Sequence, residues 1–340
     1  MLTVGVDLAA KPKNTALATV EWSIDGAHVI DLQVDVGDDA IVRSARTAAK
    51  IGIDCPLGWP DRFVQFLGEF HDGSYAAIPE PAGQDWRRSL AYRITDEKVR
   101  ADLARFTVIP LSVAADRIGI TAMRAARIQS LLAKDGHKVD RAGSGLIVEV
   151  YPAGGLAFWE MSHRRYKGTK NEEALGDLVD QLPKWLHLDE KAELCRKSDH
   201  AFDAVIAALL ARAAALDLAT RPSAAEQDTA AREGWIAMPT CPVDTLAVRQ
   251  FKDDDEGYLA WQAAHPGLFV INAERGLNPN NLVLHRATCH TISGVPTHGG
   301  PWTGPYVKFC GGRAALDHFA AGRDAVARPC RVCLPDGAPR

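Results

Sequence analysis

The sequence predicts an α/β fold, with a mixed β-sheet flanked by helices and a small additional domain at the carboxyl end. Two short apolar runs, residues 2–10 and 50–60, each place an aspartate, Asp7 and Asp54, where a strand would end. A nearly continuous apolar helix is expected after Ser198, and four of the seven cysteines crowd into the last quarter of the chain. The runs and the helix indicate a sheet covered by a buried helix, whereas the cysteines indicate a separate metal site.

The order of elements in the first part of the chain narrows this fold class. The predicted elements are three strands, a helix and a strand, over residues 2–10, 15–24, 27–36, 38–50 and 51–54. The first hairpin turn is marked by Asp25-Gly26, a strong signal for two antiparallel strands. Antiparallel strands followed by a helical crossover to a strand beside the first are the opening half of a ribonuclease-H-like architecture.

Later segments complete the sheet and divide the chain into domains. Residues 146–150 form an apolar strand, and Ser198 caps a helix that we expect to be buried against the sheet. Short strands are expected at residues 269–272 and 282–285. The predicted domains are a ribonuclease-H-like nuclease domain, an acidic linker and a small Cys/His zinc-binding domain, over residues 1–239, 240–256 and 257–340.

Composition and charge exclude several classes of protein. The 340 residues are 47% hydrophobic and 24% charged, which is typical of a folded globular chain. No apolar run reaches the ~18 residues of a membrane span, so we expect no membrane association and a cytoplasmic location. The net charge of −4 gives no general attraction to nucleic acid, so a polyanionic partner would need a basic patch such as residues 163–167.

Three aspartates are the main candidates for a catalytic centre. Asp7 and Asp54 each end an apolar strand, and Asp203 lies deep in the apolar helix, where a lone carboxylate is costly. Carboxylate oxygens suit Mg²⁺ or Mn²⁺, and nucleases of the two-metal type need several carboxylates around their ions. Asp7 would bridge both ions, and the other two aspartates would each complete one coordination sphere.

Three of the candidate acids have a structural alternative. Asp54 precedes a Pro/Gly-rich turn and could cap it. Asp199 lies one turn before Asp203 on the same helix face, but it could simply complement the helix dipole. Glu149 lies in an apolar strand, where it could be a metal ligand or could pair with Arg93 or Lys167.

Seven short motifs follow one another along the first part of the chain. They are Val-Gly-Val-Asp-Leu-Ala at 4–9, Ile-Asp-Cys-Pro-Leu-Gly-Trp-Pro at 53–60, Tyr-Arg-Ile-Thr-Asp at 92–96, Glu-Val-Tyr-Pro-Ala at 149–153, Tyr-Lys at 166–167, Asp-His-Ala-Phe-Asp-Ala at 199–204 and Glu-Gly-Trp-Ile at 233–236. Together they resemble family 429 of the domains of unknown function, regarded as a ribonuclease-H-like predicted nuclease. The resemblance covers roughly residues 1–239.

The resemblance implies the ribonuclease-H-like fold and, by inference only, a nuclease activity. Carried over by position, it implies that the metal-binding acids are Asp7, Asp54 and Asp203, with Asp199 and Glu149 as further candidates. Arg93 and Asp96 match an Arg-x-Thr-Asp motif of the family. Arg93 could contact a substrate phosphate or pair with Glu149 or Asp54, and Lys167 is the second candidate substrate contact.

The last quarter of the chain carries a candidate zinc site. A His-x-x-x-Cys pair and a Cys-x-x-Cys pair supply four ligands, which are His285, Cys289, Cys330 and Cys333. Thiolates and an imidazole suit the closed tetrahedron of structural zinc, with Cys310 and His290 as substitutes and unrelated buried cysteines as the alternative. The spacing is similar to the treble-clef-like zinc module of bacterial alkyl-phosphotriester repair proteins, which implies contact with DNA, stabilisation or protein binding.

These observations lead to one main hypothesis for function and two alternatives. The main hypothesis is a Mg²⁺- or Mn²⁺-dependent phosphodiesterase, a hydrolase that acts on DNA or RNA, with a zinc module that aids binding. One alternative is an actin-like small-molecule kinase, although no Gly-rich phosphate loop follows the first strand and no second half repeats the first. The other is a non-catalytic scaffold that binds nucleic acid or protein.

Overall fold

The chain forms two units and contains two β-sheets. The structure is a computed structural model that describes all residues except 75–77, 80–82, 107, 114–117, 294–300 and 336–340. The first unit comprises Met1–Glu21, Val29–Leu182 and Leu188–Thr240. The second comprises Trp22–His28, Pro183–His187 and Cys241–Arg340.

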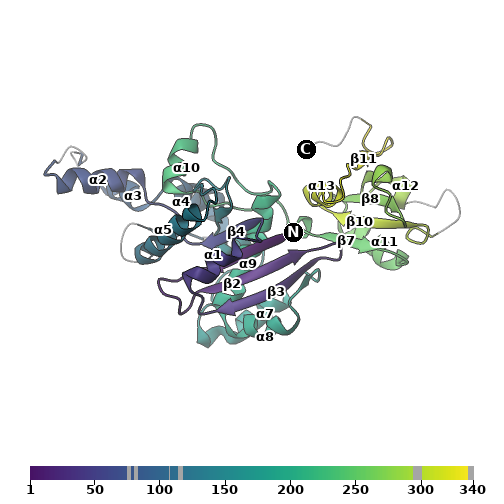
Figure 1. The fold of residues 1–340 in the computed structure, drawn as a ribbon, viewed down its shortest axis with the longest axis horizontal. Helices are drawn as coiled ribbons and strands as arrows, with labels where there is room; N and C mark the ends of the chain where they lie inside the picture. Colours follow the sequence, from purple (N-terminus) through teal and green to yellow (C-terminus); the bar gives the residue numbers. More distant parts are fainter. Residues whose placement is uncertain (75–77, 80–82, 107, 114–117, 294–300, 336–340) are drawn as a thin grey trace. The chain divides into compact units, whose positions relative to one another are not determined.

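The first sheet has six strands in the order β5-β4-β1-β2-β3-β6 (Figure 1). The strands are β1 (Leu2–Asp7), β2 (Ala16–Trp22), β3 (Ala27–Val34), β4 (Lys50–Asp54), β5 (Ile147–Glu149) and β6 (Leu186–His187). Strand β1 is antiparallel to β2 and parallel to β4, and β4 is parallel to β5. Helix α1 (Asp38–Ser44) makes the crossover that brings β4 beside β1. The predicted mixed α/β class is therefore confirmed.

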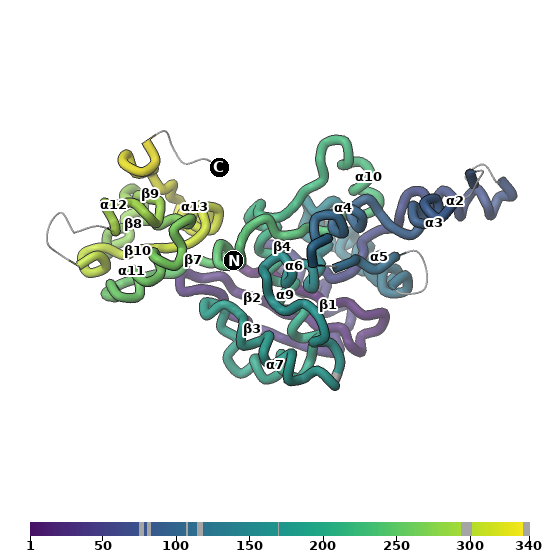
Figure 2. The backbone as a smooth tube through the Cα atoms, turned by 180° about the vertical axis from the view of Figure 1, so that it is seen from behind, coloured from purple at the N-terminus to yellow at the C-terminus, as the bar shows by residue number. Residues whose placement is uncertain are grey.

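Helices cover both faces of the central strands β1 and β4, which are buried along most of their length. On one face, the side chains of Val4, Val6, Ile51 and Ile53 form a core with α1 and α5 (Gly119–Lys134). On the other face, α9 (Asp199–Ala215) lies across β1 and β4, with α6 (Pro152–Phe158) beside it (Figure 2). The predicted buried helix after Ser198 is α9, and the Ser198 hydroxyl caps it by accepting a hydrogen bond from the backbone N–H of Ala201.

Two register-paired glycines allow α9 to lie directly on the sheet. Gly5 of β1 pairs with Gly52 of β4, and both face the helix. A Cβ atom on Gly5 would lie 2.0 Å from the carbonyl oxygen of Ala204, and one on Gly52 would lie 2.5 Å from that of Ala207. Any side chain at these two positions would therefore push the helix away from the strands.

The remaining α-helices of the first unit, among the residues that the structure describes, lie around this central pair of layers or extend from it. They are α2 (Asp61–His71), α3 (Gln84–Ala91), α4 (Ile94–Asp102), α7 (Glu172–Asp180), α8 (Ala192–Lys197) and α10 (Gln227–Glu233). Helices α2 and α3 extend away from the sheet, and α2 has no buried residue (Figure 1). In the part of the chain that the structure describes, no helix is both long enough and apolar enough to span a bilayer.

The second unit is built on a five-stranded sheet in the order β11-β9-β8-β10-β7. Its strands are β7 (Val248–Phe251), β8 (Phe269–Glu274), β9 (Val283–Arg286), β10 (Tyr306–Gly311) and β11 (Arg328–Pro329). Its helices are α11 (Asp255–Ala264), α12 (His290–Ser293) and α13 (Arg313–Ala321). Strands β8 and β9 are the two that the sequence predicts in this region.

Residues 240–256, which the sequence predicts as a linker, contain strand β7 and the first residues of α11, both in the second unit. Strand β7 pairs with β10 along four residues. The acidic run has local partners: the Asp254 side chain accepts a hydrogen bond from the backbone N–H of Gly257, and Asp253 pairs with Arg275. Acids that cap a helix and pair with an arginine are thus part of a folded segment, although their composition is typical of a linker.

Candidate functional site

The strand register and the side-chain alternation bring three aspartates together. Asp7 and Asp54 are register partners at the carboxyl ends of two parallel strands, β1 and β4. Side chains alternate along a strand, so both aspartates share the sheet face of Gly5 and Gly52, which is the face that α9 covers. Asp203, in the second turn of α9, meets them there, and one carboxylate oxygen from each aspartate lies within 4.8 Å of the other two.

Two of these aspartates have donors close to their carboxylate oxygens. The Tyr166 hydroxyl donates to Oδ1 of Asp203 at 2.8 Å, and Nζ of Lys167 lies 2.5 Å from its Oδ2. Nδ1 of His200 lies 2.6 Å from Oδ2 of Asp7. Within the described part of the chain, the Asp54 carboxylate has neither a hydrogen-bond donor nor an ion-pair partner.

The electrostatics of the cluster reflect this shortage of positive charge. Burial, followed by the negative charge of Asp7, raises the pKa of Asp54 well above its usual range. Burial also raises the pKa of Asp203 to about 6, although the ammonium group of Lys167 opposes that shift. The hydrogen bond to Asp7 raises the pKa of His200. Three clustered carboxylates and one lysine form a site that a divalent cation would complete.

Glu149 belongs to a different network. It pairs in register with Ile53, so its side chain lies on the opposite sheet face from Asp54. Both of its carboxylate oxygens accept hydrogen bonds from Arg93, at 2.6 and 2.7 Å, and one also accepts from the backbone N–H of Leu57 at 3.0 Å. Of the two roles that the sequence leaves open for Glu149, the geometry is that of a pair with Arg93.

Arg93 is fully engaged inside the first unit. Besides Glu149, its guanidinium contacts both carboxylate oxygens of Asp96, at 2.8 and 3.0 Å, and the carbonyl oxygen of Glu233 at 3.1 Å. The side chain is 1% exposed. Its neighbouring carboxylates outweigh the effect of burial and raise the pKa of Arg93 further. An arginine with these contacts is positioned to hold the walls of the site together, and its donors already have partners.

The Glu-Gly-Trp-Ile segment closes this network. The Glu233 carboxylate accepts hydrogen bonds from the first backbone N–H groups of two helices, at Asp61 of α2 and Ile94 of α4. Gly234 has φ +92°, and a Cβ there would lie 2.9 Å from Oε2 of Glu149 and 3.0 Å from Nη1 of Arg93. The motifs at 92–96, 149–153 and 233–236 are thus parts of one buried structure.

Asp199 is outside the group of three aspartates. It begins α9, where its charge complements the helix dipole. Its Oδ2 accepts a hydrogen bond from the backbone N–H of Gly168 at 3.0 Å. This bond holds the loop that carries Tyr166 and Lys167 against α9, so Asp199 positions the two side chains that contact Asp203.

A cavity of about 220 Å³ opens beside the aspartates. Its charged lining comprises Asp7, Asp54, Lys167, Glu149, Arg93 and Asp96, and Thr121 adds a hydroxyl group. The rest of the wall is largely apolar and includes Leu111, Ile118, Tyr151 and Ile236. All of these residues belong to the first unit. The cavity gives a small molecule or a polymer segment access to Asp7 and Asp54.

The structure adds two side chains to those that the sequence singles out for a role. His200 contacts Asp7, and Tyr166 contacts Asp203. A polar residue between Asp199 and Asp203, in the first turn of a helix that covers the strand ends, is the signal that could have identified His200. Tyr166 adjoins Lys167, and its signal in the sequence is an aromatic side chain within a run of basic residues.

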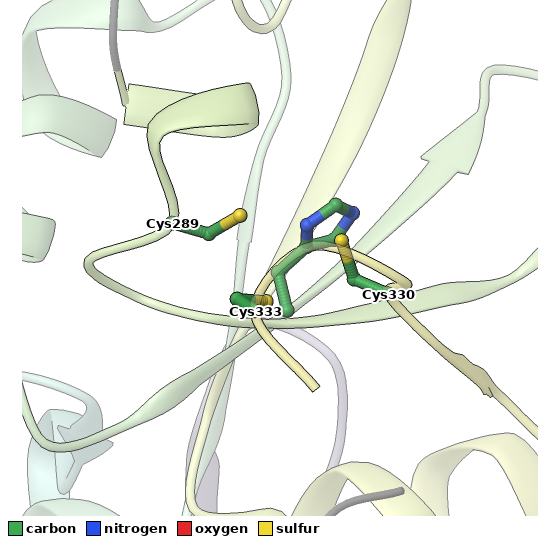
Figure 3. A group of neighbouring side chains, drawn as sticks. Cys289, Cys330 and Cys333 are labelled. Atoms are coloured by element: carbon green, nitrogen blue, oxygen red, sulfur yellow. The ribbon is translucent and has the colours of Figure 1, made fainter. Parts of the chain in front are cut away.

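The second unit holds the other candidate metal site. One ligand atom from each of His285, Cys289, Cys330 and Cys333 lies within 4.8 Å of the other three. Figure 3 shows the sulfur atoms of the three cysteines directed toward a common centre. Zinc binds thiolates at about 2.3 Å and imidazole nitrogen at about 2.0 Å, and four such ligand atoms gathered this closely could hold a zinc ion.

The local fold explains why these four residues meet. His285 lies in β9, and the backbone N–H of Cys330 donates to Leu284, which brings the Cys-x-x-Cys turn beside that strand. Burial lowers the pKa of His285 to about 4, so its imidazole is neutral at pH 7, which is the form that binds metals. The proposed substitutes, Cys310 and His290, do not belong to the group among the described residues.

Comparison with known proteins identifies a family for the larger part of the chain. A family model described as "Protein of unknown function (DUF429)" matches residues 5–227. No curated protein and no solved structure matches the chain. The matched region includes the three clustered aspartates, and the four Cys/His residues lie beyond it.

Proposed function

Because the chain belongs to the DUF429 family of proteins of unknown function, we propose its function from the site itself: a divalent-metal-dependent phosphodiesterase that hydrolyses nucleic acid. The observation that carries this proposal is the group of Asp7, Asp54 and Asp203 at the ends of adjacent strands, with one ligand oxygen from each within 4.8 Å. Carboxylate oxygens are the ligands that Mg²⁺ and Mn²⁺ prefer.

Asp54, which has no hydrogen-bond donor or ion-pair partner among the described residues, supports a resident cation. Three buried or partly buried carboxylates with a single ammonium group leave excess negative charge in a site that excludes much of the solvent. When bound, Mg²⁺ or Mn²⁺ would supply Lewis-acid chemistry and charge neutralisation at the scissile phosphate. Asp7, Asp54 and Asp203 would hold the ion or ions.

The other polar side chains of the site would position groups and bind substrate. Tyr166 and Lys167 orient the Asp203 carboxylate, and His200 orients that of Asp7. Lys167 is about half exposed and lines the cavity, so its ammonium group would also attract a substrate phosphate. Arg93, Asp96 and Glu149 would keep the wall rigid, and Asp199 would hold the Lys167 loop.

Charge near the cavity supports a polyanionic substrate. Arg164, Arg165, Lys167 and Lys170 are exposed on the loop that reaches Asp203. This local basic segment offsets the overall charge of −4, which alone would not favour nucleic acid. We assign catalysis to residues 1–239 and structural zinc binding to the domain that includes residues 257–340, where zinc would stabilise a small unit that aids substrate binding.

Metal-dependent cleavage of labelled oligonucleotides tests the proposal. The full chain would be incubated with single-stranded and duplex DNA and RNA, with Mn²⁺, with Mg²⁺ or with a chelator. We expect cleavage that requires the metal and falls by at least about 100-fold in Asp7→Asn, Asp54→Asn and Asp203→Asn. The matched control is Glu193→Gln, an exposed acid on α8 that pairs with Lys197 and lies outside the cavity.

Three results would overturn the proposal. Cleavage that survives all three aspartate substitutions would place the activity elsewhere, including in a contaminant. Metal-dependent turnover of ATP without any cleavage of oligonucleotides would instead favour a small-molecule kinase. Binding of nucleic acid with no turnover under any metal condition would favour a scaffold.

A further inference from the structure

The wall of the cavity beside the aspartates is made of two chemically different kinds of residue. Asp7, Asp54 and Lys167 are charged, and a phosphate and its metal would lie against them. The apolar part of the wall contains Pro110, Leu111, Ile118, Tyr151 and Ile236. A site that recognised only a small inorganic or sugar phosphate would be expected to present polar groups around the whole ligand, because sugar hydroxyls need hydrogen-bond partners.

Apart from the Thr121 hydroxyl, the lining beyond Asp7, Asp54 and Lys167 offers few free donors to a ligand. Arg93, Asp96 and Glu149 line the cavity, but their charged atoms are bonded to one another at 2.6 to 3.0 Å. The part of the ligand beyond the phosphate must therefore bind mainly through apolar contacts. A planar nucleobase meets this requirement, because its faces are apolar and it stacks on aromatic and aliphatic side chains.

One aromatic ring belongs to this apolar part of the wall. The Tyr151 hydroxyl donates to the carbonyl oxygen of Ile109 at 3.3 Å, and the residue directly precedes α6. Leu111 lines the same cavity and is 45% exposed. The cavity therefore offers a ring and an accessible aliphatic side chain for contact with a ligand.

We propose that the cavity takes one unpaired nucleotide, with its base against Tyr151 and Leu111 and its phosphate toward Asp7 and Asp54; this inference rests on the proposed phosphodiesterase function. The cavity volume of about 220 Å³ is below the 300–1,000 Å³ of usual small-molecule sites, which limits it to a single nucleotide. A base inside a duplex is stacked and paired, so it cannot reach this wall unless it is extruded. The substrate class is therefore single-stranded nucleic acid or an unpaired end.

Binding of a fluorescent oligonucleotide, measured by anisotropy with the full chain in Ca²⁺, tests the inference. A single-stranded 12-mer is expected to bind at least about 10-fold more tightly than the blunt duplex of the same sequence, since stacking on a protein ring typically changes affinity about 5- to 100-fold per base. Leu111→Asp is expected to remove this preference. Ile30→Asp, at a side chain of similar exposure (46%) on β3, is expected to retain it.

Tyr151 provides a second, independent pair of variants. Tyr151→Phe keeps the ring and is expected to bind like the wild type, whereas Tyr151→Leu is expected to weaken single-strand binding about 5-fold or more. Equal binding of single strand and duplex, or a Leu111→Asp variant that behaves like Ile30→Asp, would overturn the inference. Mn²⁺ binding is measured by calorimetry on the same samples. If the wild type binds Mn²⁺ but does not prefer the single strand, only the nucleotide site is wrong. If the wild type binds no Mn²⁺, the proposed function itself fails.

Discussion

The contact between β1 and α9 predicts that Gly5→Ala, the smallest possible substitution, lowers the free energy of unfolding strongly. The added Cβ would lie 2.0 Å from the carbonyl oxygen of Ala204 and 2.2 Å from the backbone nitrogen of Ala208. Both atoms belong to the helix backbone, so no side-chain rotation relieves the clash. The helix must withdraw by about 1 Å before the Cβ–oxygen distance reaches even 3.0 Å.

The magnitude follows from what surrounds α9. Most of the helix is fully buried, so withdrawal opens a gap along its whole contact with the sheet. A radial gap of about 1 Å forfeits up to half of the dispersion energy of the atoms that line it. We therefore expect Gly5→Ala to lower the free energy of unfolding by about 3 kcal/mol or more, at the upper end of overpacking effects. Asp203 would move with the helix, so the affinity for Mn²⁺ should fall as well.

Urea unfolding followed by far-ultraviolet circular dichroism measures the loss. With a slope of about 1–3 kcal/mol per molar urea, the midpoint of the first unit should fall by about 1 M or more. The control is Gly37→Ala: this glycine has φ −82°, and no atom lies within 4 Å of the place that a Cβ would take, so its free energy of unfolding should change by less than about 0.5 kcal/mol. If Gly5→Ala unfolds within about 0.5 kcal/mol of Gly37→Ala, α9 does not lie directly on the strand.

Three further predictions follow from the buried charges and the cysteine cluster. Arg93→Met should lower the free energy of unfolding by about 3–5 kcal/mol, because it leaves Glu149 and Asp96 buried without a cation. The control Arg87→Met, at an exposed arginine, should lower it by less than about 0.5 kcal/mol. Similar urea midpoints for the two variants would contradict the network around Arg93. Cys330→Ser should lose zinc, measured by elemental analysis, whereas the buried Cys310→Ser should keep it, and the reverse result would make Cys310 the ligand instead. Burial lowers the pKa of Lys50 to about 8, so between pH 8 and its ordinary pKa of 10.5 the unfolded chain holds a proton that the folded chain does not. The free energy of unfolding of the wild type, relative to that of Lys50→Met, should therefore rise across this window by up to about 3 kcal/mol. A difference that stays constant with pH in urea titrations would refute this prediction.

The sequence could predict the elements whose side-chain pattern is local. Strands β1 and β4 alternate clearly and each ends in an aspartate, and α9 is apolar on all sides, which makes Asp203 conspicuous. Asp7 and Asp54 could be placed at one sheet edge because parallel neighbours end together, and the buried position of Asp203 in α9 marked it as a third member. The same reasoning identified the four Cys/His residues, since metal-ligand spacing is itself a local pattern.

Other features depend on long-range register, which a single sequence does not encode visibly. Whether Glu149 faces Asp54 or Arg93 is set by how β5 aligns with β4, and its pairing with Ile53 turns it away from the aspartates. His200 has a role only because the first turn of α9 reaches the end of β1. Strand β7 could not be predicted because the acids that follow it are typical of a linker. The helix cap formed by Asp254 and the ion pair of Asp253 with Arg275 are seen only in the folded unit.

Calorimetric titration of the metal-free full chain with Mn²⁺ tests the central claim most directly. The wild type and Glu193→Gln should bind Mn²⁺ alike, whereas Asp54→Asn should lose most of the binding heat, because Asp54 is the aspartate without a protein partner among the described residues. Asp54→Asn should remain folded, since the change removes charge from a crowded group of acids. Equal Mn²⁺ binding by all three proteins, or none by the wild type, would contradict a metal centre at the three aspartates.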